Sequence, residues 1–183
     1  TGASATEQAF YQLSGEASPD IIHFATHGFT LPTTAGNTEA ANNFQIAPNP
    51  LLRCGLVMAG GNRGWKGEAS TDEDDGILTG LEISAMQLPN TELAVLSACE
   101  TGLGQIEGSE GVFGLQRAFK LAGVNYIMAS LWPVPDKETS EFMENFYSYW
   151  LDGETIQQAF AHTQHAMRKK YAPYYWAGFT LVR

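Results

Sequence analysis

Cysteine and basic residues are scarce in this chain, and each scarcity excludes a class of protein. The only two cysteines, Cys54 and Cys99, form neither a CxxC pair nor a disulfide framework. A single disulfide between them stays open, but a reduced, cytoplasmic setting is the more economical interpretation. Lysine and arginine together number 10 against 20 acidic residues, which leaves a net charge of −10. Because binding to phosphates needs a basic surface, this charge argues against a nucleic-acid partner.

Long apolar runs are also lacking. No run approaches the roughly 18 residues that a membrane-spanning helix needs, so the sequence predicts no contact with a membrane. A signal-peptide pattern is absent too, but this says little, because the chain begins with Thr1 rather than Met and we expect it to be a fragment of a longer protein. The composition, 44% hydrophobic and 11% aromatic, and the length of 183 residues are typical of a single globular domain over residues 1–183.

Strand-like and helix-like segments alternate along the chain. Compact apolar runs predict strands at 20–26, 51–59, 92–98, 125–131 and, at the end, 176–182. Helical patterns predict helices at 5–13, 78–86, 112–122, 136–150 and 154–171. Residues 30–50 and 60–76 have no period and are expected to form long loops. Such alternation predicts an α/β fold with a parallel or mostly parallel sheet covered by helices.

Two reactive side chains follow predicted strands directly. His27 comes after the strand at 20–26 and Cys99 after the strand at 92–98, where the carboxyl ends of parallel strands form ligand sites. A thiolate is a nucleophile, and a nearby imidazole supplies the base that generates it. Gly28 lets the backbone approach a substrate closely, and amides at such a place can hold an oxyanion. The pattern alone fits a catalytic pair and a structural pair equally well.

Several ordered motifs carry a more specific signal. HFATHG at 23–28, LSACETG at 96–102, GVFGLQRAFKLAGV at 111–124 and SLWPVPD at 130–136 resemble the CHAT family. These are caspase-like domains of proteins with tetratricopeptide repeats, related to separases and caspases. The resemblance covers nearly the whole chain and implies a caspase-like three-layer α/β sandwich with a mostly parallel central sheet. One departure is that the strand and helix that usually open the family's domain are absent.

The resemblance implies a function as well. It implies a caspase-like cysteine endopeptidase that cleaves a protein partner in bacterial defence or signalling, regulated by a tetratricopeptide-repeat region in the same protein. His27 is the implied general base and Cys99 the nucleophile, with the amides of Gly28 and Cys99 as the oxyanion hole and no cofactor or metal. Two alternatives stay open. One is a catalytically silent scaffold or protein-interaction module, and the other is an acyl-transferring enzyme of another fold.

By the same resemblance, the substrate pocket falls on Ser97 and on the segment from Trp132 to Asp136. Trp132 would offer an apolar wall to a long side chain, and Asp136, or secondly Asp75, would pair with its cationic tip. Glu100, beside the nucleophile, would tune the thiol or contact the substrate. We therefore expect Arg or Lys before the scissile bond. The competing interpretation of Asp136 is that it caps the helix at 136–150.

Other conspicuous residues are assigned structural roles. Cys54 lies inside an apolar run and is predicted to be a core thiol. His23 shares the strand parity of His27 and is predicted to be a hydrogen-bonded structural histidine. His162 and His165 share a helix face, but two histidines make a poor metal site, and the acidic run at 72–75 lacks the pattern of a calcium loop. The aromatic residues of the helix at 136–150 are expected to pack it onto the core: Tyr147, Tyr149 and Trp150.

Overall fold

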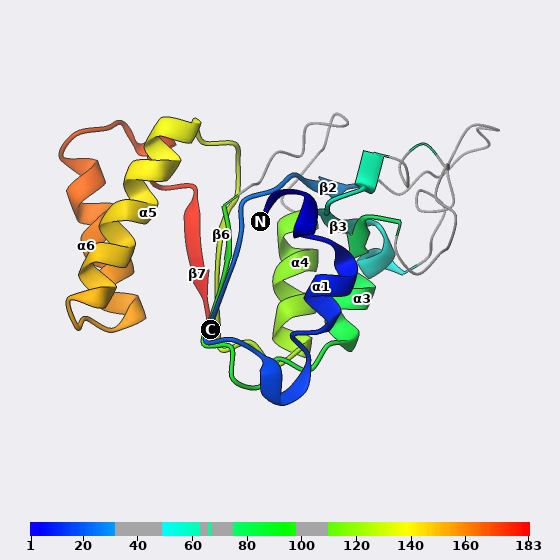
Figure 1. Cartoon of the computed structure of the whole chain (residues 1–183). Coiled ribbons are helices and arrows are strands. Elements are labelled where there is room, and N and C mark those ends of the chain that lie inside the picture. Colours follow the sequence, from blue (N-terminus) through cyan, green and yellow to red (C-terminus); the bar gives the residue numbers. More distant parts are fainter. Residues whose placement is uncertain (32–48, 63–65, 67–74, 98–109) are drawn as a thin grey trace.

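The computed structural model of the chain describes residues 1–31, 49–62, 66, 75–97 and 110–183 (Figure 1). A four-stranded sheet in the order β1-β5-β6-β7 lies at its centre. Its strands are Ile21–Phe24, Leu93–Leu96, Tyr126–Ser130 and Phe179–Val182. The pairs β1–β5 and β5–β6 are parallel and only β7 runs antiparallel to its neighbour. The predicted α/β architecture with a mostly parallel sheet is thus confirmed.

Both faces of the sheet are buried, because successive side chains along its strands point alternately into two hydrophobic cores. In β5, Ala94 and Leu96 face one hydrophobic cluster while Leu93 and Val95 face the other. A strand buried on both sides has no polar face, which explains why this segment is a continuous apolar run. β6 is likewise buried at every position. The two central strands are therefore the most strongly specified elements of the fold.

Helices form the two outer layers (Figure 1). On one side lie α1 (Glu7–Tyr11), α3 (Gly80–Ala85) and α4 (Glu110–Leu121), around a cluster that includes Phe24 and Phe119. On the other side lie α5 (Asp136–Leu151) and α6 (Ile156–Arg168), around Phe142 and Phe146. Within the described ranges, no helix combines the length and hydrophobicity needed to cross a bilayer.

A second, smaller sheet was not predicted from the sequence. It is antiparallel, in the order β2-β3-β4, and its strands are Gly28–Thr30, Cys54–Val57 and Ile77–Thr79. Strands of three residues are too short to show a period of two, so β2 was missed and β4 was assigned to a helix. The strand predicted at 51–59 is also shorter, because Pro50–Leu52 form a 3₁₀ turn. The predicted loops at 30–50 and 60–76 lie largely outside the described residues.

One helix start and one helix cap differ from the prediction for local reasons. Thr79 ends β4 and caps α3, its hydroxyl accepting from the Glu82 amide while the Glu82 carboxylate accepts from the Thr79 amide. The other correction concerns Asp136, which is the first residue of α5 and not its N-cap. Pro135 holds the extended cap position with φ −56° and ψ 145°, and it carries no side-chain acceptor. The Asp136 carboxylate is therefore not used as a cap.

Cys54 lies where three elements meet. Its thiol is buried, and burial raises the pKa of the thiol to about 11. A Cβ atom built on Gly114 of α4 would lie 2.7 Å from the Cys54 sulfur, and one on Gly80 of α3 would lie 2.9 Å from it. Both helices therefore approach β3 closely because they carry glycine at this contact. The structure places Cys54 in the core, as predicted.

This contact predicts a coupling between Gly114 and Cys54. Gly114→Ala should clash with the sulfur in the parent protein, whereas in a Cys54→Ala background the clash is gone and alanine's higher helix propensity is gained. The change in free energy of unfolding caused by Gly114→Ala is expected to be about 1–2 kcal/mol more favourable in that background. Urea unfolding of the parent, both single variants and the double variant measures it. Additive effects would show that the thiol does not set this helix approach.

Candidate functional site

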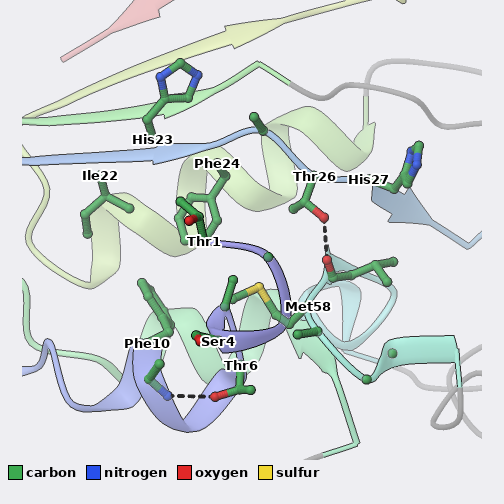
Figure 2. Close-up of a pocket in the computed structure, with 18 of the residues that line it drawn as sticks. Thr1, Ser4, Thr6, Phe10, Ile22, His23, Phe24, Thr26, His27 and Met58 are labelled. Atoms are coloured by element: carbon green, nitrogen blue, oxygen red, sulfur yellow. Dashed lines mark hydrogen bonds between the residues drawn. The ribbon is translucent and has the colours of Figure 1, made fainter.

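His27 sits in a short turn between β1 and β2, and that turn is held from β3. The Thr26 hydroxyl donates to the Val57 carbonyl, and the Val57 amide donates to the His27 carbonyl at 2.8 Å (Figure 2). These bonds fix the backbone on both sides of the imidazole, while the side chain itself is exposed. His27 is thus presented at the carboxyl end of β1 by a rigid turn.

Ser97 directly follows β5, level with the carboxyl end of β1. Phe24 of β1 is in register with Leu96 of β5, and the Ser97 amide donates to the Phe24 carbonyl at 3.1 Å. Ser97 and His27 both line one pocket of about 620 Å³. The structure therefore brings together the two strand ends that the sequence singled out. Cys99 and Glu100, which follow on from Ser97, lie outside the described residues.

Helix α5 forms a wall of this pocket. The lining residues from α5 repeat at helical spacing and belong to one face: Asp136, Thr139, Ser140, Met143, Glu144 and Tyr147. Asp136 and Glu144 contribute carboxylates, and the Ser140 hydroxyl donates to the Glu144 carboxylate at 3.3 Å. The described lining contains no lysine or arginine. Apart from the two histidines, its charge is therefore negative, which suits a cationic side chain.

A chain of hydrogen bonds crosses the pocket from α5 to β5. The Tyr147 hydroxyl lies 3.1 Å from His23 Nδ1, and His23 Nε2 lies 2.9 Å from Ser97 Oγ. The Ser97 hydroxyl also donates to the Phe24 carbonyl at 3.2 Å. Burial lowers the pKa of His23 and raises the pKa of Tyr147 to about 12. The His23 residue is exposed to solvent, and both ring nitrogens lie within hydrogen-bonding distance of these partners.

Comparison with known proteins identifies the family. The chain matches the family model of the CHAT domain over residues 1–183. The chain belongs to the CHAT domain family. It is similar to tetratricopeptide repeat protein 28 of Homo sapiens, with 27% identity, and to that of Mus musculus, with 26% identity, in each case over 191 residues. These matches cover 99% of this chain and 8% of each relative. The predicted resemblance is confirmed, and the observed sandwich is consistent with a caspase-like CHAT fold.

Two predicted pocket residues of the CHAT domain lie elsewhere. The Trp132 indole stacks on Tyr174 and packs over Gly178, where an added Cβ would lie 2.7 Å from the indole. Asp75 lies before β4, and its carboxylate accepts from the Ile77 amide at 2.7 Å. Neither residue is among those that line the pocket with Ser97 and Asp136. Pro133, Val134 and Met143 provide its apolar surface in place of Trp132.

Trp132 instead anchors the segment that carries Asp136. Its indole N–H donates to the Tyr174 carbonyl at 2.8 Å, and the Tyr174 hydroxyl donates to the Pro133 carbonyl at 2.8 Å. At the start of α5, the Thr139 hydroxyl donates to the Val134 carbonyl at 3.2 Å. These bonds hold the pocket end of α5 against the C-terminal segment. The role of Trp132 in this site is therefore to position the wall and not to form it.

The backbone amide of Gly28 is not used in the pairing of β2 with β3. The Val57 amide donates to His27 and the Leu31 amide donates to Arg53, so the odd-numbered residues of β2 form the hydrogen-bonded pairs with β3. Amides alternate in direction along a strand, and the Gly28 amide consequently points away from β3. Among the described residues, no group of three or more His, Cys, Asp or Glu side chains could hold a metal ion.

A second hollow, of about 870 Å³, lies on the other side of β1 (Figure 2). Its surface is largely apolar, with Phe10, Ile22, Phe24 and Met58 among its members. The titratable residues in its described lining are His23 and His27, and the imidazole of His23 points away from it (Figure 2). Because the carboxylates lie on the α5 side of the strand, the α5 pocket is the better candidate for holding a charged substrate side chain.

Sequence reasoning did not place three lining residues in this pocket. His23 and Tyr147 were assigned structural roles, and Glu144 was not singled out. The signal for Glu144 and Tyr147 was available, since both share the helix face of Asp136 at helical spacing. His23 shares strand parity with His27, but no pattern in the sequence indicated that α5 would lie beside it.

Proposed function

We propose that this CHAT domain is a cysteine endopeptidase of the caspase-like class, with His27 as general base and Cys99 as nucleophile. The observation that carries the proposal is the pairing of β1 with β5, which brings His27 and Ser97 to one pocket. Cys99 follows Ser97 by two residues, and two residues span at most about 7 Å. A nucleophile at position 99 is therefore within reach of the pocket.

The reaction we propose follows from these positions. The Cys99 thiol transfers its proton to His27, and the thiolate attacks the scissile carbonyl carbon to form a tetrahedral intermediate. The amides of Gly28 and Cys99 donate hydrogen bonds to its oxyanion. The protonated His27 then gives its proton to the departing amine, which leaves a thioester on Cys99. Water, deprotonated by His27, hydrolyses the thioester and restores the thiol.

The α5 pocket supports a substrate with a basic residue before the scissile bond. Asp136 and Glu144 place negative charge in its lining, and Val134 and Met143 offer apolar surface to an aliphatic stem. A pocket of about 620 Å³ also accommodates a side chain the size of arginine. The proposed substrate is therefore a protein cleaved after Arg or Lys. Asp136 and Glu144 are the proposed partners of the cation, with Ser97 beside them.

Part of the setting of the domain is proposed from its relatives. Both are named as tetratricopeptide repeat proteins, and the chain spans only 8% of their length. We infer that residues 1–183 form the CHAT peptidase domain of a larger protein with a repeat region that regulates cleavage. A role in bacterial defence or signalling is proposed from the resemblance of the sequence motifs alone. The free, buried thiol of Cys54 suits the reducing cytoplasm that we propose as its location.

A thiol-reactive peptide probe with arginine next to its reactive group tests this function. It is expected to label Cys99 and to leave Cys54 unmodified, because the Cys54 thiol is buried and has a pKa of about 11. Intact mass and peptide mapping give the site, and Cys99→Ala provides the background. Labelling no faster than that of an unstructured thiol, in the domain and in the full-length protein, would favour the catalytically silent scaffold.

A further inference from the structure

One set of donors satisfies every polar atom around His23. With the Ser97 hydroxyl proton donated to the Phe24 carbonyl, Ser97 Oγ accepts from His23 Nε2. His23 then carries its proton on Nε2, and Nδ1 accepts from the Tyr147 hydroxyl. In this set the imidazole is neutral. A second proton on Nδ1 would require the Tyr147 hydroxyl to turn and accept instead of donating.

The position of His23 connects this chain to the substrate pocket. Ile22 and Phe24 point from β1 toward the side of α1, whereas His23 points to the opposite side (Figure 2). There it lines the pocket together with Asp136 and Glu144. The other titratable groups of the lining are His27, at the end of the same strand, and Tyr147. No arginine or lysine is among the described lining residues, so His23 and His27 are the groups there that can become positive.

We propose that His23 is a specificity-determining residue, which keeps this side of the pocket uncharged so that a cationic substrate side chain can be accepted. The proposal deepens the peptidase assignment and rests on it. With neutral His23, the cation meets two carboxylates and a hydroxyl-lined surface. With protonated His23, the imidazolium would repel the cation and compete for the carboxylates. Tyr147 is a positioning residue, because it acts through the proton on its hydroxyl.

Burial assists this role by lowering the pKa of His23. The neutral form therefore predominates from alkaline pH down to below the ordinary histidine value of about 6.5. Tyr147→Phe removes the hydroxyl that donates a hydrogen bond to His23 Nδ1. Because Nδ1 accepts this bond only when it is unprotonated, the bond favours the neutral imidazole. Tyr147→Phe should thus raise the pKa of His23, and a charge-selective pocket should lose its selectivity at a higher pH.

The test compares two peptides that differ only by arginine or citrulline before the scissile bond. Citrulline has nearly the shape of arginine and no charge, so the ratio of their kcat/KM values reports charge selection. Because His27 also lines the pocket, only the part of the pH-dependent change in this ratio that disappears in a His23 variant is assigned to His23. The ratio is expected to fall about fivefold as His23 becomes protonated, the size of a screened charge–charge interaction. Histidine NMR resonances of the same protein give the midpoint independently of catalysis.

Three variants separate the proposal from a structural role. His23→Gln keeps a donor for Ser97 but does not titrate in this range. In this variant the arginine-to-citrulline ratio of kcat/KM should lose the pH-dependent fall that accompanies protonation of His23. Tyr147→Phe should move the NMR midpoint and the ratio together, by about one pH unit upward. Tyr149→Phe, on the same helix but outside the described lining of the pocket, should move neither.

Each outcome decides between the two proposals. The role of His23 is overturned if the pH-dependent fall in the kcat/KM ratio persists unchanged in His23→Gln. It is also overturned if Tyr147→Phe leaves the NMR titration midpoint of His23 in place. Neither result affects the peptidase proposal. If neither peptide is cleaved, binding of both peptides to Cys99→Ala is followed by NMR over the same pH range. Selective binding of the arginine peptide that weakens with His23 protonation would support the pocket and refute the peptidase. No charge preference in binding would overturn the inference as well.

Discussion

Cys99→Ala and His27→Ala are each expected to lower kcat/KM for a cleavable protein substrate by at least about 10³-fold. The first removes the nucleophile and the second removes the base beside it, and the other imidazole that lines the pocket, His23, is held by Ser97 and Tyr147. Unfolding by urea should change little in His27→Ala, because the imidazole is exposed and the turn is held by backbone bonds. Rates should be measured on full-length protein as well as on the domain.

Cys54→Ala is the matched control for these two variants. It also removes a cysteine, but the Cys54 sulfur is buried against Gly80 and Gly114, away from the strand ends. It should keep most of the activity and lose only stability. Wild-type turnover by Cys99→Ala would refute the proposed dyad.

The next largest expected effect is on specificity. Peptides with Arg before the scissile bond should be cleaved about 5–10-fold faster than peptides with Leu, because each of the two exposed lining carboxylates contributes a solvent-screened attraction to the cation. Asp136→Asn and Glu144→Gln should each reduce this ratio at every pH, because each removes a lining carboxylate. Matched peptides carrying Arg, Lys, Met, Leu or Asp at that position measure the preference.

Two acidic residues outside the pocket are the controls for this prediction. Glu138 lies in the same first turn of α5 as Asp136 but does not line the pocket, so Glu138→Gln is the first control. Asp75→Asn alters a residue whose carboxylate accepts from the Ile77 amide beside β4. Neither should change the Arg preference. A preference for Leu or Met that survives Asp136→Asn and Glu144→Gln would refute a cation pocket.

Local patterns predicted the central part of the fold well. β5 and β6 are apolar at successive positions because helices cover both sheet faces, and such runs identify a buried strand without any knowledge of the partners. Helix α6 begins at a Thr155–Gln158 capping box, whose two residues are only three positions apart in the sequence. The small sheet escaped prediction, because three-residue strands acquire their conformation from their neighbours.

The candidate site divides along the same line. The sequence by itself determined that His27 follows one strand and that Ser97 lies at the carboxyl end of another, because strand propensity and the glycine and proline that end strands act over a few residues. Only the tertiary structure decided that Trp132 turns toward Tyr174, that Asp75 bonds beside β4, and that Tyr147 reaches His23. His23 and Tyr147 are 124 residues apart in the chain, and their contact depends on how α5 packs across the sheet. Packing of that kind is set by the shapes of two whole surfaces, which no short stretch of sequence encodes.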